Sequence, residues 1–209
     1  MSATTCFKRR RADMLLIVNF AVFQIAWLSS VIGGAQQMPW LGPVAVSVAL
    51  IIHLAAARRP LEEVLLVVSC ALIGACFDSV LVASGWVTYK AGLFSEFLAP
   101  YWIITMWMLF ATTLNVSMRW MRGKPILASV FGFLGGPTTY LAGEKLGGIV
   151  LVNQTAALVA LAVGWAIMMP VLMRLSENFD GMPGKRRVWA REAQPVVQRR
   201  SRYIEEETS

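Results

Sequence analysis

Residues 61–87 read LEEVLLVVSCALIGACFDSVLVASGWV, an apolar run in which Asp78 is the only acidic or basic side chain beyond the first turn. A helix needs roughly 20 such residues to cross a hydrocarbon core of about 30 Å. The rest of the chain has the same character: 57% of its 209 residues are hydrophobic, 15% are charged, and the mean hydropathy is +0.60. This composition is too apolar for a water-soluble domain and excludes a disordered chain, a collagen-like chain and a disulfide scaffold.

Working outward from that stretch, six segments are long and apolar enough to be membrane spans. The predicted spans are residues 14–34, 40–57, 61–87, 97–120, 125–143 and 149–175. We therefore predict an all-α polytopic membrane protein, a bundle of six transmembrane helices over residues 14–175. A basic N-terminus (1–13) precedes it. A basic tail (176–209) follows, and we expect it to be partly disordered because it is rich in proline, glutamine and charge.

Positive charges set the expected orientation. Of the 19 lysines and arginines, all but Lys90 and Lys145 fall in the termini or in the loops on one side of the six spans. Short cytoplasmic loops are enriched in Lys and Arg, so both termini are expected in the cytoplasm. The net charge of +7 is then no sign of nucleic-acid binding. It attracts anionic lipid head groups to the cytoplasmic face, or it merely enforces the topology.

The first apolar stretch has a second interpretation, a cleaved secretory signal, because residues 33–35 (GGA) resemble a small-residue cleavage site. The apolar region of a signal peptide is about 7–15 residues long, whereas this stretch is near 20, so an uncleaved span is favoured.

Motifs for enzymatic or metal chemistry are not recognisable in the sequence. CxxC, HExxH, GxSxG, P-loop and GxGxxG patterns do not occur, so we expect no metal and no cofactor. Cys70 and Cys76 lie about 9 Å apart along one predicted helix and cannot pair. Cys6 stands alone and carries only a weak signal for palmitoylation. The abundant Met and Trp residues are explained by core packing and interfacial belts.

Polar residues at membrane depth are the candidates for a functional site. An ionisable side chain in hydrocarbon costs at least about 2.5 kcal/mol, so Asp78 needs a partner or a role. Counting about 1.5 Å per residue from the end of each span places several polar residues at the same level. The candidate functional polar layer consists of Asp78, Thr105, Tyr140, Asn153 and Trp102. It is either a binding or reaction site, or a structural knot of hydrogen bonds between helices.

Two further features accompany this layer. A smaller inner layer near the cytoplasmic ends of the spans contains Asn19, His53 and Asn115. A lone histidine in such a place is more often structural than catalytic. The fifth predicted span carries Gly135, Gly136 and Pro137 at its middle, and this sequence predicts a kink or a short break in the helix.

Several of these residues occur in patterns that resemble a known family. The patterns are Asn19-Phe20 with Gln24 and Trp27; Gly74 with Asp78-Ser79 and Gly85; Trp102 with Trp107, Phe110-Ala111 and Leu114; and Gly135-Gly136-Pro137 with Tyr140, Ala142-Gly143 and Leu146-Gly147. Over residues 14–175 the chain resembles the small bacterial inner-membrane proteins catalogued as domain of unknown function 2878. The resemblance implies a multi-pass protein of the bacterial inner membrane. It supplies no established activity and points to lipid or envelope chemistry.

The sequence is compatible with three functions. The favoured one is a non-enzymatic membrane protein that binds a lipid or small apolar molecule, or assists a membrane enzyme that modifies lipids, through the layer around Asp78. The first alternative is an intramembrane enzyme that uses Asp78 and Tyr140 as an acid–base pair, which requires contact within about 3 Å. The second alternative is a small transporter with inverted three-helix halves.

Overall fold

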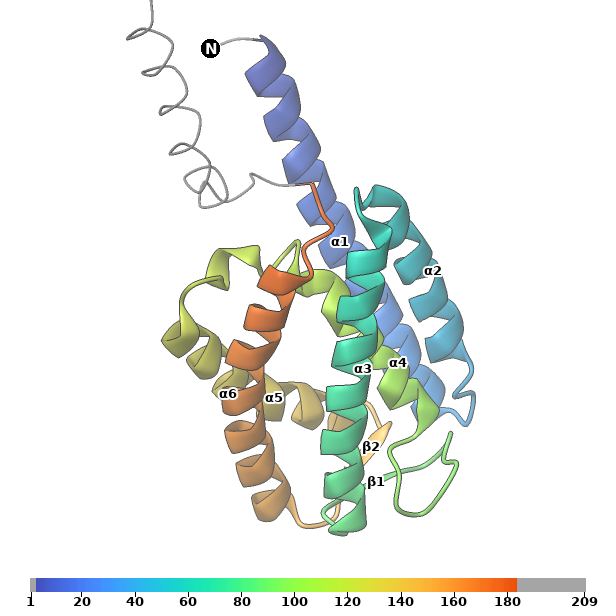
Figure 1. Cartoon of the computed structure of the whole chain (residues 1–209). Helices are drawn as coiled ribbons and strands as arrows, with labels where there is room; N and C mark the ends of the chain where they lie inside the picture. The colour runs from blue at the N-terminus through green and yellow to red at the C-terminus, as the bar shows by residue number, and fades with distance from the viewer. Residues whose placement is uncertain (1–2, 184–209) are drawn as a thin grey trace, which may run out of the picture.

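The structure, a computed structural model, describes residues 3–183. Most of the tail predicted to be partly disordered therefore lies outside the described residues. The described part forms six α-helices, one 3-10 helix and two short strands (Figure 1): α1 (Ala3–Ala35), α2 (Leu41–Ala56), α3 (Pro60–Ala83), β1 (Val87–Tyr89), α4 (Tyr101–Leu114), η1 (Arg119–Met121), α5 (Pro125–Lys145), β2 (Ile149–Leu151) and α6 (Gln154–Asn178).

Helices α1 to α4 alternate in direction along the bundle, α5 lies across it, and α6 runs back toward the end where α3 begins, so the bundle has two distinct ends (Figure 1). We call the upper end in Figure 1, where α3 begins and α2, α4 and α6 end, the basic end. The opposite end, where both strands lie, is called the strand end. Helix α4 contacts α1, α2, α3 and α6, and α5 packs chiefly against α6.

Among the described residues, four helical segments are long and apolar enough to cross a membrane. They are Asp13–Ala35 within α1, together with α3, α5 and α6. Helices α2 and α4 are also apolar but have only 16 and 14 residues. At 1.5 Å per residue they are about 24 Å and about 21 Å long. This is the helix content of an integral membrane protein, with two helices shorter than the spans predicted for them.

The fourth helix is much shorter than its prediction, since Tyr101–Leu114 replaces the expected 97–120. Pro100 is its N-cap and has an extended backbone, with ψ of 152°. A residue that precedes proline is also driven out of the helical region, so the helix cannot extend back through Ala99. Beyond Leu114 the chain turns at Asn115 and reaches η1 through a separate turn.

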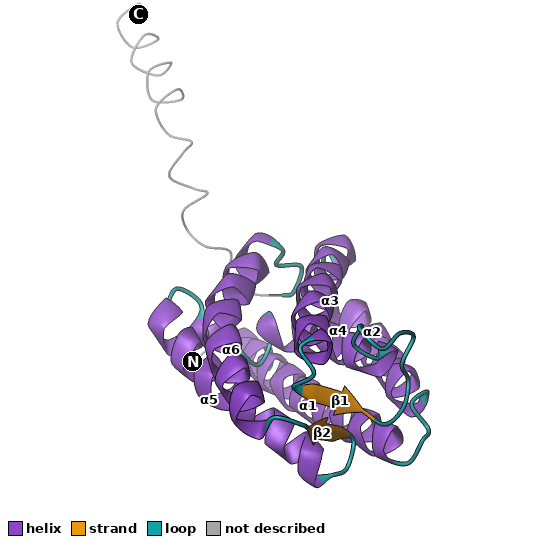
Figure 2. Cartoon of the chain, turned by 90° about the horizontal axis from the view of Figure 1, so that it is seen from below, coloured by secondary structure: helices purple, strands orange, loops and turns teal. Residues whose placement is uncertain are grey.

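The two strands were not predicted, because Val87 and residues 149–151 were assigned to the ends of spans and residues 88–89 to a loop. They pair antiparallel, with Val87 opposite Leu151 and Tyr89 opposite Ile149. Figure 2 shows the pair lying across the strand end of the bundle. The strand residues alternate buried, exposed and buried, so each strand turns two side chains into the core. As a consequence α6 begins at Gln154, five residues later than its predicted span.

Helix α5 is not broken where a kink or short break was expected. It continues from Pro125 to Lys145 with Gly135, Gly136 and Pro137 inside it. Proline removes one backbone hydrogen bond but fits a helix whose neighbours hold it in place. The Thr138 hydroxyl donates to the Leu134 carbonyl at 2.6 Å, which supplies a side-chain hydrogen bond at this point. No half-helix end therefore points toward Asp78 from α5.

Tryptophan rings that lie against glycines bring the helices together. The indole of Trp107 in α4 lies on Gly74 of α3, and the indole of Trp165 in α6 lies on Gly136 of α5. At each glycine a Cβ atom would overlap the ring. Close approach of helices through small residues is typical of membrane bundles. These contacts place α3, α4, α5 and α6 around one shared interior.

Candidate functional site

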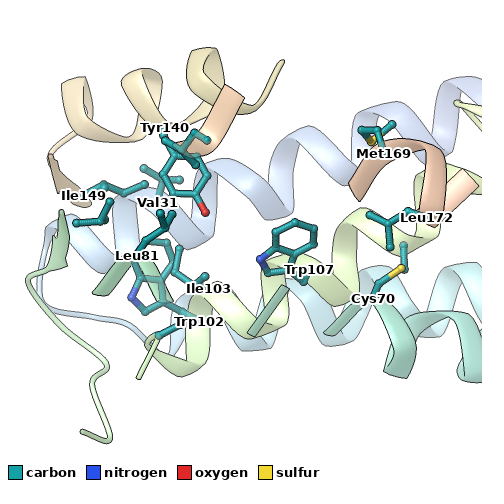
Figure 3. Close-up of a cluster of buried hydrophobic side chains, with 14 of the residues drawn as sticks. Val31, Cys70, Leu81, Trp102, Ile103, Trp107, Tyr140, Ile149, Met169 and Leu172 are labelled. Carbon is teal, nitrogen blue, oxygen red and sulfur yellow. The ribbon is translucent and has the colours of Figure 1, made fainter. Parts of the chain in front are cut away.

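The side chain of Asp78 lies in that shared interior and is fully buried. Its Oδ2 accepts a hydrogen bond of 2.6 Å from the indole Nε1 of Trp107, and its Oδ1 accepts one from the hydroxyl of Tyr140. In Figure 3 the nitrogen of Trp107 and the oxygen of Tyr140 point into the same interior region. We call these three residues, which come from α3, α4 and α5, the Asp78 cluster.

Local sequence explains why Trp107 reaches Asp78. Gly74 is four residues before Asp78, so both residues lie on the same face of α3. Without a side chain at position 74, the indole of Trp107 rests on the α3 backbone and its N–H extends toward the carboxyl one turn away. Gly74 thus provides the space for the indole of Trp107, and Asp78 accepts its N–H.

Aromatic side chains surround the Asp78 cluster. The ring of Trp165 stacks on that of Trp107, with centroids 4.8 Å apart and planes inclined by 18°. Tyr89 of β1 is buried against the edge of Trp102, at a centroid distance of 5.6 Å. Burial, and then the carboxylate of Asp78, raise the pKa of Tyr89 well above its usual value. The Tyr89 phenol therefore stays protonated beside the cluster.

Within the described residues, the Tyr89 hydroxyl has no hydrogen bond of good geometry, although it interacts with Tyr140. The indole N–H of Trp165 is likewise buried without a partner there. Two buried donor groups near the Asp78 cluster are thus without an acceptor among the described residues. The Asp78 carboxyl itself receives hydrogen bonds from Trp107 and Tyr140, and Tyr89 interacts with Tyr140.

The predicted polar layer is only partly brought together. Asp78 and Tyr140 are hydrogen-bonded as the depth argument requires. Trp102 instead donates its Nε1 hydrogen to the Ala91 carbonyl at 3.0 Å, and the Thr105 hydroxyl bonds to the carbonyl of Trp102 in its own helix. Asn153 is exposed and caps α6 by accepting from Ala156 N at 3.1 Å. These three side chains serve local structure and are not partners of Asp78.

A second buried polar cluster lies at the basic end, centred on Glu63. Its carboxyl is fully buried and accepts from Asn115 Nδ2 and from the backbone N–H of Gly181, each at 2.7 Å. The other carboxyl oxygen lies 2.8 Å from Nε2 of His53. Sequence reasoning missed Glu63, because it counted the residue only as one of the charges at the membrane surface.

Arginines extend this cluster to the segment that follows α6. Arg122 bonds to the side chain of Asn115 and donates to Asp180 at 2.7 Å, and Arg119 donates to the other oxygen of Asp180 at 2.6 Å. Burial lowers the pKa of Arg119, and the Asp180 carboxylate opposes that shift. We call the whole set the basic-end network: His53, Glu63, Asn115, Arg119, Arg122 and Asp180.

The predicted inner layer is thus divided between two places. His53 and Asn115 belong to the basic-end network and meet through Glu63. Asn19 bonds instead to the Thr112 carbonyl at 3.1 Å and to Ser117. Asn19 and His53 nevertheless line the same small cavity of about 20 Å³, which has room for about one water molecule.

A larger hollow lies on the side of the bundle near the strand end. It has a volume of about 640 Å³ and is open to the outside. The hollow, which we call the α6 groove, is lined by Trp86, Asn153, Thr155, Ala156, Val159, Ala160 and Val163. Neither this groove nor the small cavity is lined by Asp78. Within residues 3–183, no three His, Cys, Asp or Glu side chains are grouped to hold a metal ion.

These apolar helices, closed around a hydrogen-bonded acid, define a helical integral membrane protein. The chain belongs to the family described as "Protein of unknown function (DUF2878)", whose model matches residues 16–171. The resemblance inferred from the sequence is therefore confirmed. No curated protein and no solved structure matches the chain.

Proposed function

We propose that the protein is a non-enzymatic membrane protein that binds the acyl chain of a lipid, or a similar apolar molecule, in the α6 groove. The observation that carries this proposal is the groove itself, about 640 Å³ in volume and apolar over most of its lining. Small-molecule sites commonly enclose about 300–1,000 Å³ and combine an apolar wall with a few polar groups. The α6 groove has a comparable volume and lining, but it is open along one side, so an acyl chain would lie against the surface of the bundle and would not be enclosed.

Its chemistry matches a lipid with one polar end. Val159, Ala160 and Val163 offer an apolar wall along α6, whereas Asn153 and Thr155 lie at the start of the helix. Trp86 forms the remaining side, and its carbonyl accepts from the N–H groups of Val152 and Asn153, which holds the indole beside α6. An acyl chain would lie along the valines, with its head group toward the strand end.

We further propose that all six helices span the bacterial inner membrane, with both termini in the cytoplasm. The alternating directions of α1, α2, α3 and α4 along the bundle support this topology for the first four helices (Figure 1). Within the described residues, the lysines and arginines gather at the basic end, and only Lys90 and Lys145 lie at the strand end. Anionic lipids would meet the basic end. Labelling Lys145→Cys and Lys124→Cys from outside intact cells tests this orientation, because only the first should react.

A cross-linking experiment tests lipid binding. The full chain is placed in nanodiscs that contain a phosphatidylglycerol with a photoactivatable acyl chain, and the cross-linked residues are mapped by mass spectrometry. Val159→Trp fills the groove, and Val171→Trp adds the same bulk to the same exposed helix outside it. We expect cross-links at residues 156–163 that Val159→Trp abolishes and Val171→Trp leaves unchanged. Equal labelling along α6 in all three proteins would contradict the proposal.

In the cell, a protein that binds lipid in this groove could assist an enzyme that modifies lipids. Comparative lipid profiles of a deletion strain, and of the same strain expressing Val159→Trp or Val171→Trp, would test it. A changed profile that Val171→Trp restores and Val159→Trp does not would support the groove. A profile that the deletion leaves unchanged would count against any role in lipid chemistry.

An intramembrane enzyme is the second candidate, and the hydrogen bond between Tyr140 and Asp78 favours it. General acid–base work requires such contact. Both carboxyl oxygens of Asp78 are, however, already occupied by donors of the protein, and the α6 groove is not lined by this residue. The transporter alternative has less support, because α5 is uninterrupted and therefore lacks the broken-helix feature.

A further inference from the structure

The loop between β1 and α4 carries an unusual concentration of exposed apolar side chains. Leu93, Phe94, Phe97 and Leu98 are 46%, 74%, 67% and 50% exposed. They flank the short polar sequence Ser95-Glu96. A loop in water has no reason to present two phenylalanines and two leucines side by side, and exposed apolar patches mark surfaces of interaction.

Hydrogen bonds and one ring contact attach this loop to the bundle. The backbone N–H of Tyr101 donates to the Gly92 carbonyl at 3.1 Å, and the Trp102 indole donates to the Ala91 carbonyl at 3.0 Å. The ring of Phe94 lies against that of Tyr101, with centroids 5.4 Å apart. The apolar side chains are therefore carried by a loop that is anchored to the bundle.

One contact places the end of the loop beside the last turn of α3. The backbone N–H of Ala99 donates to the Ser79 hydroxyl at 3.0 Å. Ser79 is four residues before Ala83, the last residue of α3, so this contact lies about 6 Å inside the end of that helix. Helix α4 begins two residues later, at Tyr101. The loop thus lies beside the last turn of a membrane-length helix.

The short helices leave room for the loop at this level. Helices α2 and α4 are about 24 Å and about 21 Å long, against a hydrocarbon core of about 30 Å. In Figure 1 the loop extends sideways from the start of α4, close to the strand end of α3. Trp40, at the start of α2, is 56% exposed at the same end, as is usual for tryptophan at a membrane interface.

Two backbone N–H groups in the second half of the loop have hydrogen-bond partners within the loop. The N–H of Phe97 donates to the Ser95 hydroxyl at 3.3 Å, and the N–H of Leu98 donates to the Ser95 carbonyl at 3.4 Å. Irregular backbone at membrane depth requires such internal partners. Ser95 thus accepts hydrogen bonds from the backbone N–H groups of Phe97 and Leu98.

We propose that residues 92–98 form a membrane-inserted loop, whose four apolar side chains contact the acyl chains of the leaflet at the strand end. Ser95 and Glu96 lie at the level of the head groups. The loop completes the membrane-facing surface where α2 and α4 are too short. This inference requires a membrane around the bundle but not lipid binding in the α6 groove, which is formed by other residues.

Fluorescence quenching in nanodiscs tests the loop directly. The native cysteines are replaced by serine or alanine, and a single environment-sensitive label is attached at Phe94→Cys or Phe97→Cys. Val48→Cys on the exposed face of α2 serves as a membrane control, and the exposed Lys145→Cys at the strand end serves as a water control. Quenching is measured with spin-labelled lipids and with aqueous iodide.

We expect the labels at 94 and 97 to be quenched by lipids with shallow acyl spin labels, and to lose most of the iodide quenching seen at 145. Iodide quenching equal to that at 145 would overturn the proposal and indicate a bilayer that thins around the short helices. Protection from both quenchers would also overturn it, because a second copy or another protein would then cover the loop. Both phenylalanines are exposed, so their replacement removes little core packing.

Discussion

The indole ring of Trp107 lies directly on the backbone of Gly74, where a Cβ atom would overlap three atoms of the ring. The same indole donates its N–H to Asp78, one turn further along α3. Position 74 therefore controls both the spacing of α3 and α4 and the hydrogen bond to the buried carboxyl. Packing and polarity at this point cannot be changed independently.

Gly74→Ala is expected to destabilise the protein. Overpacking of a tight core typically costs about 1–3 kcal/mol, and here displacement of the ring also weakens a hydrogen bond to a buried carboxyl. Thermal unfolding in detergent measures the loss. A double-mutant cycle with Trp107→Leu provides the control, because the alanine should cost much less once the indole is gone. Equal costs in both backgrounds would show that Gly74 acts independently of Trp107.

Neighbouring glycines of α5 offer a sharper comparison. A Cβ at Gly136 would overlap the ring of Trp165, whereas a Cβ at Gly135 would meet only the edge of Phe131 at 3.9 Å. We expect Gly136→Ala to lower the unfolding temperature. Gly135→Ala should be neutral or stabilising, since alanine favours a helix over glycine by about 1 kcal/mol. A similar response of the two variants would mean that Trp165 does not fix α5 against α6.

Asp78 and Tyr140 are predicted from the sequence to lie at one level, and these two residues meet. The partner from α4 is not predicted, because the level of a residue does not determine which way its side chain faces. Trp102 and Thr105 lie near the correct height, but the residue that reaches Asp78 is Trp107, selected by the gap at Gly74. Depth counting predicts layers, whereas small residues decide which members of a layer touch.

Other parts of the structure are only weakly indicated by the amino-acid sequence. The strands are three residues each and pair across about 60 positions, so neither gives a local pattern distinct from the end of a helix. In the sequence, Glu63 and Asp180 cannot be distinguished from ordinary surface charges. Only the fold shows that the chain after α6 returns across the basic end and encloses them. Long-range burial of a charge is not visible in local sequence.

Replacement of Asp78 by asparagine separates the two candidate functions. An amide retains one acceptor for the Trp107 N–H and offers one donor to the Tyr140 oxygen, so Asp78→Asn should fold. Asp78→Ala leaves both partners unsatisfied, at about 1–3 kcal/mol each, and should unfold more easily. In the lipid-binding proposal, Asp78→Asn keeps its acyl cross-links in the α6 groove. A folded Asp78→Asn protein that has lost cellular activity but keeps those cross-links would favour the enzyme.

Adjacent glutamates at the start of α3 give a matched test of the basic-end network. Glu63 is fully buried and contacts His53, Asn115 and Gly181. Glu62 pairs with Arg59, whose side chain is 60% exposed. Removing one partner of a buried charged network costs about 3–5 kcal/mol. An exposed pair is worth about 0–1 kcal/mol.

We therefore expect Glu63→Ala to lower the unfolding temperature strongly and Glu62→Ala to change it little. The chemical change is identical, so helix propensity and net charge cancel in the comparison. Limited proteolysis provides a second readout, because Gly181 loses its side-chain anchor in Glu63→Ala. Cleavage after α6 should accelerate in that variant alone. Equal stability and equal cleavage of the two variants would show that the buried carboxyl does not hold the chain against the bundle.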